Sequence, residues 1–137
     1  MRTRTLLSVL ALAGAGLTAC GGGGDGGGGP NPTPGSLDVV LTTAPSAPGA
    51  IMFTVSGGQI DGVTTSYSGY EFATATNSRK VLVTGDLVAG TVVQIQVPDV
   101  ANVDNYVVQV LQVAARSTAA IPYQNLPTGG FTFDVLP

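Results

Sequence analysis

Residues 51–56 read IMFTVS, and this stretch decides the fold class. Ile51, Phe53 and Val55 occupy every second position. Successive side chains of a strand point to opposite faces, so these three residues would share one face of an extended chain. The same alternation occurs in three further segments, residues 37–42, 93–97 and 131–136. Each of these segments predicts a β-strand with one face toward a core.

The composition of residues 37–137 also favours strands. Val, Ile and Thr are frequent there, whereas the whole chain has only 9% charged residues, so the side chains that usually cover helix surfaces are scarce. Clusters of Gly, Pro, Asn and Asp separate the apolar segments at intervals typical of turns between short strands. We therefore predict an all-β domain over residues 37–137, an antiparallel β-sandwich of about seven to nine strands.

Three finer expectations concern particular segments. Residues 106–115 (YVVQVLQVAA) form the most apolar stretch of this domain, which predicts a long strand buried on both sides in the centre of a sheet. A short helical turn is expected over residues 100–105. The charged residues 77–80, Asn-Ser-Arg-Lys, are expected to form a hairpin turn.

The first twenty residues resemble the signal of a bacterial lipoprotein precursor. Arg2 and Arg4 precede an apolar run over residues 6–17, which at about 18 Å is too short to cross a bilayer core of about 30 Å. Leu17-Thr18-Ala19-Cys20 then resembles a lipobox. The resemblance implies that residues 1–19 are a cleaved signal helix and that Cys20 receives a diacylglycerol as the new N-terminus. Gly21, in place of an Asp, favours the outer membrane over the inner one.

Residues 20–36 are predicted to be a flexible tether. After Cys20 the sequence is GGGGDGGGGPNPTPGS, which offers no side chain for a core and cannot offset its ordering entropy. As a flexible coil it would span about 20–24 Å. The mature protein is therefore expected to be anchored on the membrane by lipid, without spanning it.

The strand pattern of residues 37–137 weakly resembles the cohesin-type and immunoglobulin-like β-sandwich modules of exported bacterial proteins. The order of a short strand, a Pro-containing loop and a second apolar strand carries this resemblance, and no residue motif does. The resemblance implies the architecture and no site.

Composition excludes several function classes. The chain has five Lys and Arg against eight Asp and Glu, which leaves no basic surface for nucleic acid. It has no histidine, and acylation of its single cysteine would remove the thiol, so the commonest general base and a thiol nucleophile are both missing. Ser78 and Lys80 are too exposed in a turn to form a catalytic dyad. We therefore expect a non-enzyme without a cofactor.

Two sets of residues are candidates for binding. Tyr67 and Tyr70 flank Ser68-Gly69, and if that dipeptide is a turn the rings could stack on a sugar or a peptide. A weak calcium site is the other candidate because carboxylate and amide oxygens suit Ca²⁺, although the same residues commonly cap turns. Its residues are Asp99, Asn102, Asp104 and Asn105.

The sequence thus predicts a lipid-anchored, non-catalytic protein of the cell envelope or cell surface that acts through contacts with an unknown protein. The alternative is a glycan- or calcium-binding module on the cell surface.

Overall fold

The computed structural model describes residues 29–116, 118 and 124–137. The predicted signal peptide, Cys20 and the first part of the predicted tether lie outside these residues. Within the described residues, no helix has both the length and the apolar character needed to cross a membrane.

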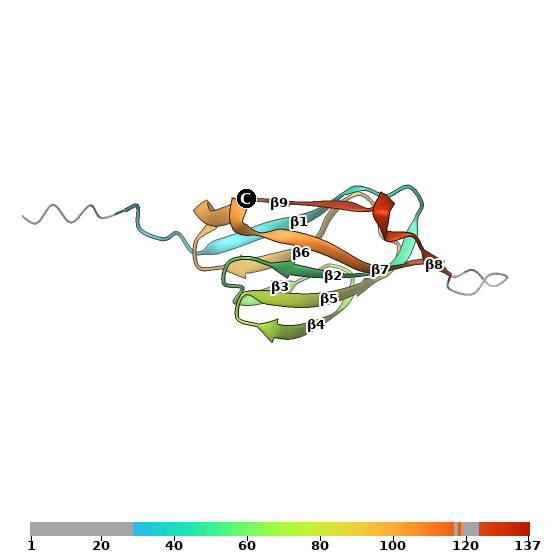
Figure 1. Cartoon of the computed structure of the whole chain (residues 1–137), viewed down its shortest axis with the longest axis horizontal. Helices are drawn as coiled ribbons and strands as arrows, with labels where there is room; N and C mark the ends of the chain where they lie inside the picture. Colours follow the sequence, from blue (N-terminus) through green and yellow to red (C-terminus); the bar gives the residue numbers. More distant parts are fainter. Residues whose placement is uncertain (1–28, 117, 119–123) are drawn as a thin grey trace, which may run out of the picture.

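The described residues form nine strands and two short 3₁₀ helices (Figure 1). They are β1 (Gly35–Thr43), β2 (Pro48–Ser56), β3 (Gly62–Thr64), β4 (Ser68–Ala75), β5 (Ser78–Thr84), β6 (Gly90–Val97), η1 (Val100–Asn105), β7 (Val107–Ala115), β8 (Asn125–Leu126), η2 (Thr128–Gly130) and β9 (Thr132–Leu136). Strand β1 begins two residues before the predicted start of the domain.

The strands make two antiparallel sheets that pack face to face. One sheet has the order β3-β6-β1-β9 and the other the order β4-β5-β2-β7-β8. In Figure 1 the first sheet lies behind and above the second, with β4 at the lower margin of the molecule. The prediction of an all-β antiparallel sandwich of seven to nine strands is confirmed.

The core lies between the two sheets and is built from the alternating residues that the sequence placed inward. Those with at most 2% exposure include Leu37, Val39, Leu41, Ile51, Phe53, Val55, Val93, Ile95 and Val97. Phe53 of β2 meets Phe133 of β9 with ring centroids 5.0 Å apart, which joins the two sheets at the centre. No polar or charged side chain is buried among the described residues.

The prediction for residues 106–115 was wrong in two respects. Strand β7 pairs along its length with β2, but on its other side the short β8 reaches only Val113 and Ala114. Only Val113 of this strand is buried: the outward residues are open to solvent, and the inward-facing Val108 and Val110 are half-buried. The apolar run therefore forms a strand beside the edge of the sheet, covered on one face, and Tyr106 precedes it.

The hairpin turn predicted at residues 77–80 lies two residues earlier. Ala75 pairs with Ser78, so residues 76–77 make the turn and β5 starts at Ser78. Arg79 and Lys80 consequently belong to β5 and point to opposite faces of the sheet. Arg79 shares the inner side with buried Val81, and Lys80 lies on the outer side.

The short helical turn expected at residues 100–105 is confirmed as η1. Asp99 caps it: one carboxylate oxygen, Oδ1, accepts hydrogen bonds from the backbone N–H of Ala101 at 3.1 Å and of Thr33 at 3.2 Å. The backbone N–H of Val100 in turn donates to the carbonyl of Thr33 at 2.9 Å. The last residues of the predicted tether are therefore fastened to η1 before β1 begins.

Tyr106, directly after η1, closes the core at the same end of the sandwich. The residue is 7% exposed, and its hydroxyl donates to the carbonyl of Gln59 at 2.8 Å. Gly57 allows the chain to pass this corner, because its φ is +137° and a Cβ there would lie 1.9 Å from the carbonyl oxygen of Asn105.

The two ends of the sandwich differ in what they carry. The chain enters β1 at the end where η1 and the C-terminus lie, which we call the tether end (Figure 1). The opposite end carries helix η2 and the segments of residues 44–47, 65–67 and 85–89. Neighbouring strands are antiparallel, so each of these segments follows a strand that ends there or precedes one that begins there. The long axis of the sandwich therefore leads away from the residues that precede β1.

Candidate functional site

The two outer faces of the sandwich differ in chemistry. On the four-stranded sheet, polar side chains are hydrogen-bonded to one another: Gln94 Nε2 donates to Asp38 Oδ1 at 2.8 Å, and Gln96 Nε2 donates to Ser36 Oγ at 2.8 Å. This face meets its own hydrogen-bonding needs across strands β1 and β6.

The outer face of the five-stranded sheet combines apolar and aromatic side chains with polar ones. Val81 and Val83 of β5 are buried. Lys80 and Leu82 alternate with them along the strand and therefore point outward. The register places Tyr70 opposite Leu82, and Phe72 opposite Lys80. We call this surface the aromatic face, and it comprises Tyr70, Phe72, Lys80, Leu82, Met52, Thr54, Gln109 and Gln112.

A shallow groove lies on the same outer face and reaches Leu82, the residue opposite Tyr70. It has a volume of about 230 Å³, and apolar side chains form most of its wall. Its lining residues are Ala50, Met52, Leu82, Gln112 and Ala114. Across the strands that carry it, spaced about 4.8 Å apart, the aromatic face extends about 14 Å from β4 to β7.

Strand β4 is the edge of this sheet, and all eight of its residues are exposed. Tyr70 is 65% exposed and Phe72 is 53% exposed, although side chains of their size usually lie in a core. The two residues are separated by one position and share a face, so their Cα atoms lie about 6.6–7 Å apart. The edge strand thus carries two neighbouring rings into solvent.

Arg79 fastens β4 to the body of the sandwich. Its side chain is 13% exposed, and its Nε lies 2.8 Å from Glu71 Oε1 of β4, close enough for an ion pair but without hydrogen-bond geometry. The guanidinium also donates to the carbonyl of Ile60 at 2.5 Å and to that of Ala75. The edge strand is therefore held in place from its inner side, which leaves its outer side unobstructed.

Lys80 is the charged residue of the aromatic face. Among the described residues, Arg79 pairs with Glu71 and Arg116 pairs with Asp86, whereas no ion pair involves Lys80. Phe72 lies directly across the strand pair from Lys80, and Thr54 lies on its other side. The aromatic face thus combines two rings with one unpaired cation.

The structure separates the two tyrosines that the sequence grouped together. Ser68 and Gly69 begin β4 and do not form a turn, so the expected arrangement of Tyr67 and Tyr70 around a turn is wrong. Tyr67 is half-buried and packs against the core, while Tyr70 is exposed. The neighbour of Tyr70 is Phe72, which the sequence reasoning missed. Alternation of Tyr70 and Phe72 in residues 68–75 was the available signal.

The four residues proposed for calcium lie in or beside η1. Asp99 uses both carboxylate oxygens locally, because Oδ2 accepts from Asn102 Nδ2 at 3.1 Å in addition to the capping bonds of Oδ1. Asp104 and Asn105 lie at the other end of η1. Among the described residues, no three His, Cys, Asp or Glu side chains are grouped as a metal site. Calcium binding here stays a prediction.

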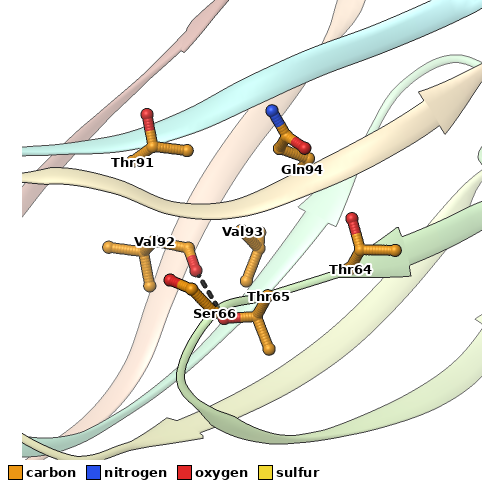
Figure 2. Close-up of a pocket in the computed structure, with 7 residues that line it drawn as sticks. All are labelled: Thr64, Thr65, Ser66, Thr91, Val92, Val93 and Gln94. Carbon is orange, nitrogen blue, oxygen red and sulfur yellow. Dashed lines mark hydrogen bonds between the residues drawn. The ribbon is translucent and has the colours of Figure 1, made fainter.

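A second hollow is polar and lies at the end of the short strand β3. Thr91 and Val92 of β6 extend past the last residue that β3 pairs with, and a pocket of about 420 Å³ opens there (Figure 2). Thr65 Oγ1 spans it by donating to the carbonyl of Val92 at 2.7 Å. Its other lining side chains are Thr64, Ser66, Val93 and Gln94. The pocket offers hydroxyl and amide groups but no ionisable side chain.

The chain matches no protein-family model, no curated protein and no solved structure. Of the hollows and patches on the described residues, the aromatic face has the strongest physical reason to be covered by a partner, since it exposes two rings beside an unpaired edge.

Proposed function

We propose that this protein is a lipid-anchored, non-catalytic component of the bacterial cell envelope or cell surface that binds another protein through its aromatic face and strand β4. The observation that carries the proposal is the exposure of Tyr70 and Phe72 side by side on an edge strand whose eight residues are all exposed.

Physical arguments support a protein as the partner. Exposed apolar patches mark interaction sites, and tyrosine and phenylalanine are enriched in the centres of interfaces. A long exposed edge strand is a hazard that proteins usually cover, shorten or charge. Here β4 has eight residues and no charged side chain on its outer face. Binding of a protein would cover the edge and the rings together.

The lipid anchor is supported by the lipobox-like Leu17-Thr18-Ala19-Cys20, and Gly21 favours the outer membrane over the inner one. Within the proposal, the tether fastens the tether end of the sandwich near the bilayer. The strands then lead away from the membrane, so β4 is accessible from the side.

Site-specific photocrosslinking tests the proposed interface. A photoreactive phenylalanine analogue replaces Phe72 in the full chain, and a matched protein carries it at Asp134 on the opposite outer face. After irradiation of intact cells, we expect one discrete crosslinked protein from position 72 and none from position 134. Crosslinks of equal yield at both positions, or at neither, would contradict the proposed interface.

Membrane fractionation tests the anchor separately. The wild-type chain should partition with membranes and the Cys20→Ala chain should not. Protease treatment of intact cells then distinguishes the cell surface, where the domain is digested, from the interior of the envelope, where it is protected. Membrane retention of both proteins would contradict lipid anchoring.

A glycan is the second candidate partner, because Tyr70 and Phe72 share a face with the amides of Gln109 and Gln112. Rings stack on sugars while amides bind hydroxyl groups. Binding of the full chain to immobilised polysaccharides, lost in Tyr70→Ala and Phe72→Ala but kept in Tyr67→Phe, would favour this candidate over a protein.

A further inference from the structure

Strand β4 offers a partner more than an apolar patch, because one of its two backbone edges is unpaired. Among the residues that the structure describes, only β5 pairs with it, and the other edges of the two sheets are shorter: β8 has two residues, β3 three and β9 five. The N–H and C=O groups on the free edge can pair with an extended segment of another chain. Among the described strands, β4 is therefore the longest site for strand addition.

We infer that the partner binds as an extended strand added to β4, with acidic side chains on its outward face and apolar side chains on its inward face. This inference rests on the proposed function and specifies the chemistry of the protein that the aromatic face would bind.

Charge is the argument for acidic side chains on the outward face. Lys80 is one strand in from the edge, opposite Phe72, and it is the cation without an ion pair among the described residues. Asp and Glu side chains are missing from the outward positions of β4, β5, β2 and β7. A carboxylate on an added strand would extend past the ring of Phe72 toward the Lys80 ammonium. No other charge on the aromatic face would compete for it.

The inner side of β4 is the argument for apolar side chains facing inward. Gly69 and Ala73 leave this side thinly covered on either side of Glu71, and a small cavity of about 70 Å³, which Glu71 also lines, lies between β3 and β4. Val63 and Val81 form part of its wall. Apolar side chains on the inward face of an added strand would continue the core at this open side of the sandwich.

The same charge pattern argues against a second copy of this chain as the occupant. If two β4 strands paired, the outward positions facing Tyr70 and Phe72 would again be Ser68, Tyr70, Phe72 or Ala75, none of which is acidic. Glu71 points to the inner side, where it pairs with Arg79. Lys80 would have no ion pair in such a dimer, whereas a carboxylate of an acidic strand would form one with it.

Synthetic peptides test the inference with the full chain. The probes are fluorescein-labelled peptides TVEVEVEVT and TVKVKVKVT, which differ only in the charge of one face. Fluorescence anisotropy should show tighter binding of the glutamate peptide to the wild-type chain. Lys80→Gln should weaken that binding by about 1.4- to 5-fold, the range that an exposed ion pair supports. Added salt should reduce the difference.

Arg116→Gln is the matched control, because it removes the same charge from an exposed ion pair away from β4. It should leave the affinity unchanged. Two further glutamate peptides carry N-methyl groups on alternate residues, each removing the backbone donors of one edge of the peptide. A strand pairs through one edge, so one of the two should lose binding and the other should keep it.

The outcomes separate the inference from the proposed function. If the Phe72 photocrosslink forms but the two peptides bind equally, or if Lys80→Gln and Arg116→Gln act alike, the acidic strand is wrong and the protein interface stands. Equal binding of the two N-methylated peptides excludes strand addition. A self-associated chain that Phe72→Ser converts to a monomer would overturn the inference in favour of a second copy. If no crosslink forms from position 72 and neither peptide binds, both the proposed interface and the acidic strand are wrong.

Discussion

The hydroxyl of Tyr106 provides the sharpest test of the fold as described, and Tyr106→Phe is the substitution that removes it. The hydroxyl donates to the carbonyl of Gln59 at 2.8 Å, while the ring closes the core. A net hydrogen bond contributes about 0.5–1.5 kcal/mol, and an acceptor left buried without a partner costs more. Gln59 is exposed, so water can reach its carbonyl. We therefore expect a loss of about 1 kcal/mol at pH 7.

The same substitution should change how stability depends on pH. Burial raises the pKa of the Tyr106 hydroxyl above its ordinary value of 10.0, and the nearby carboxylates of Asp61 and Asp99 raise it further. The unfolded chain then releases this proton at a lower pH than the folded chain does. The stabilisation that the Tyr106 hydroxyl contributes is complete below pH 10. It is lost as the pH rises from 10 toward the pKa of Tyr106 in the folded state.

Urea unfolding of the two proteins, followed by far-ultraviolet circular dichroism, measures both effects. At pH 7 the variant should have a lower free energy of unfolding, and a separate thermal scan should show a melting temperature lower by about 4–8 °C. Between pH 10 and 11 the difference should shrink, because only the wild-type chain loses the Tyr106 contribution. Equal stabilities at pH 7, or a difference that stays constant up to pH 11, would refute the reasoning.

The remaining predictions concern a turn, the core and the edge strand. Gly57→Ala should cost at least about 3 kcal/mol, since its Cβ would collide with backbone at positive φ, whereas Gly129→Ala, with nothing within 4 Å, should not change thermal unfolding. Phe53→Ala should lower the free energy of unfolding in urea by about 3–5 kcal/mol because it leaves a cavity in the core. Phe72→Ala at the surface should lower it by less than about 1 kcal/mol. Arg79→Ala should cost about 1.5–3 kcal/mol and speed hydrogen exchange of the β4 amides; unchanged exchange would contradict its role as the fastening of β4.

The sequence predicted the core well because alternation is a local property. Ile51, Phe53 and Val55 share a face wherever the strand lies, and a two-layer sandwich then requires that face to be inward. The capping of η1 by Asp99 was equally local, since its carboxylate accepts from the backbone N–H of Ala101 two residues further on.

Position within a sheet was not predictable in this way, because it depends on which strands pair. The apolar run in β7 suggested a central strand, but β8 pairs with it at only two residues, and no property of the run itself indicates this. For the candidate site, the sequence identified Tyr70 but paired it with Tyr67. Tyr70 and Phe72 alternate just as buried residues do, so only the position of β4 at the edge shows that they face solvent.

The arrangement of β1 has a mechanical consequence. This strand follows directly on the chain that enters at the tether end, and it is flanked by β6 along residues 35–41 and by β9 along residues 38–43. A load borne by β4 and resisted through the N-terminus would pull β1 along its own axis, so both ladders would be sheared at once instead of opened one bond at a time. Resistance to such a load depends on the rate of forced unfolding and not on equilibrium stability. The strand nearest the tether is thus placed to act as a force-bearing clamp.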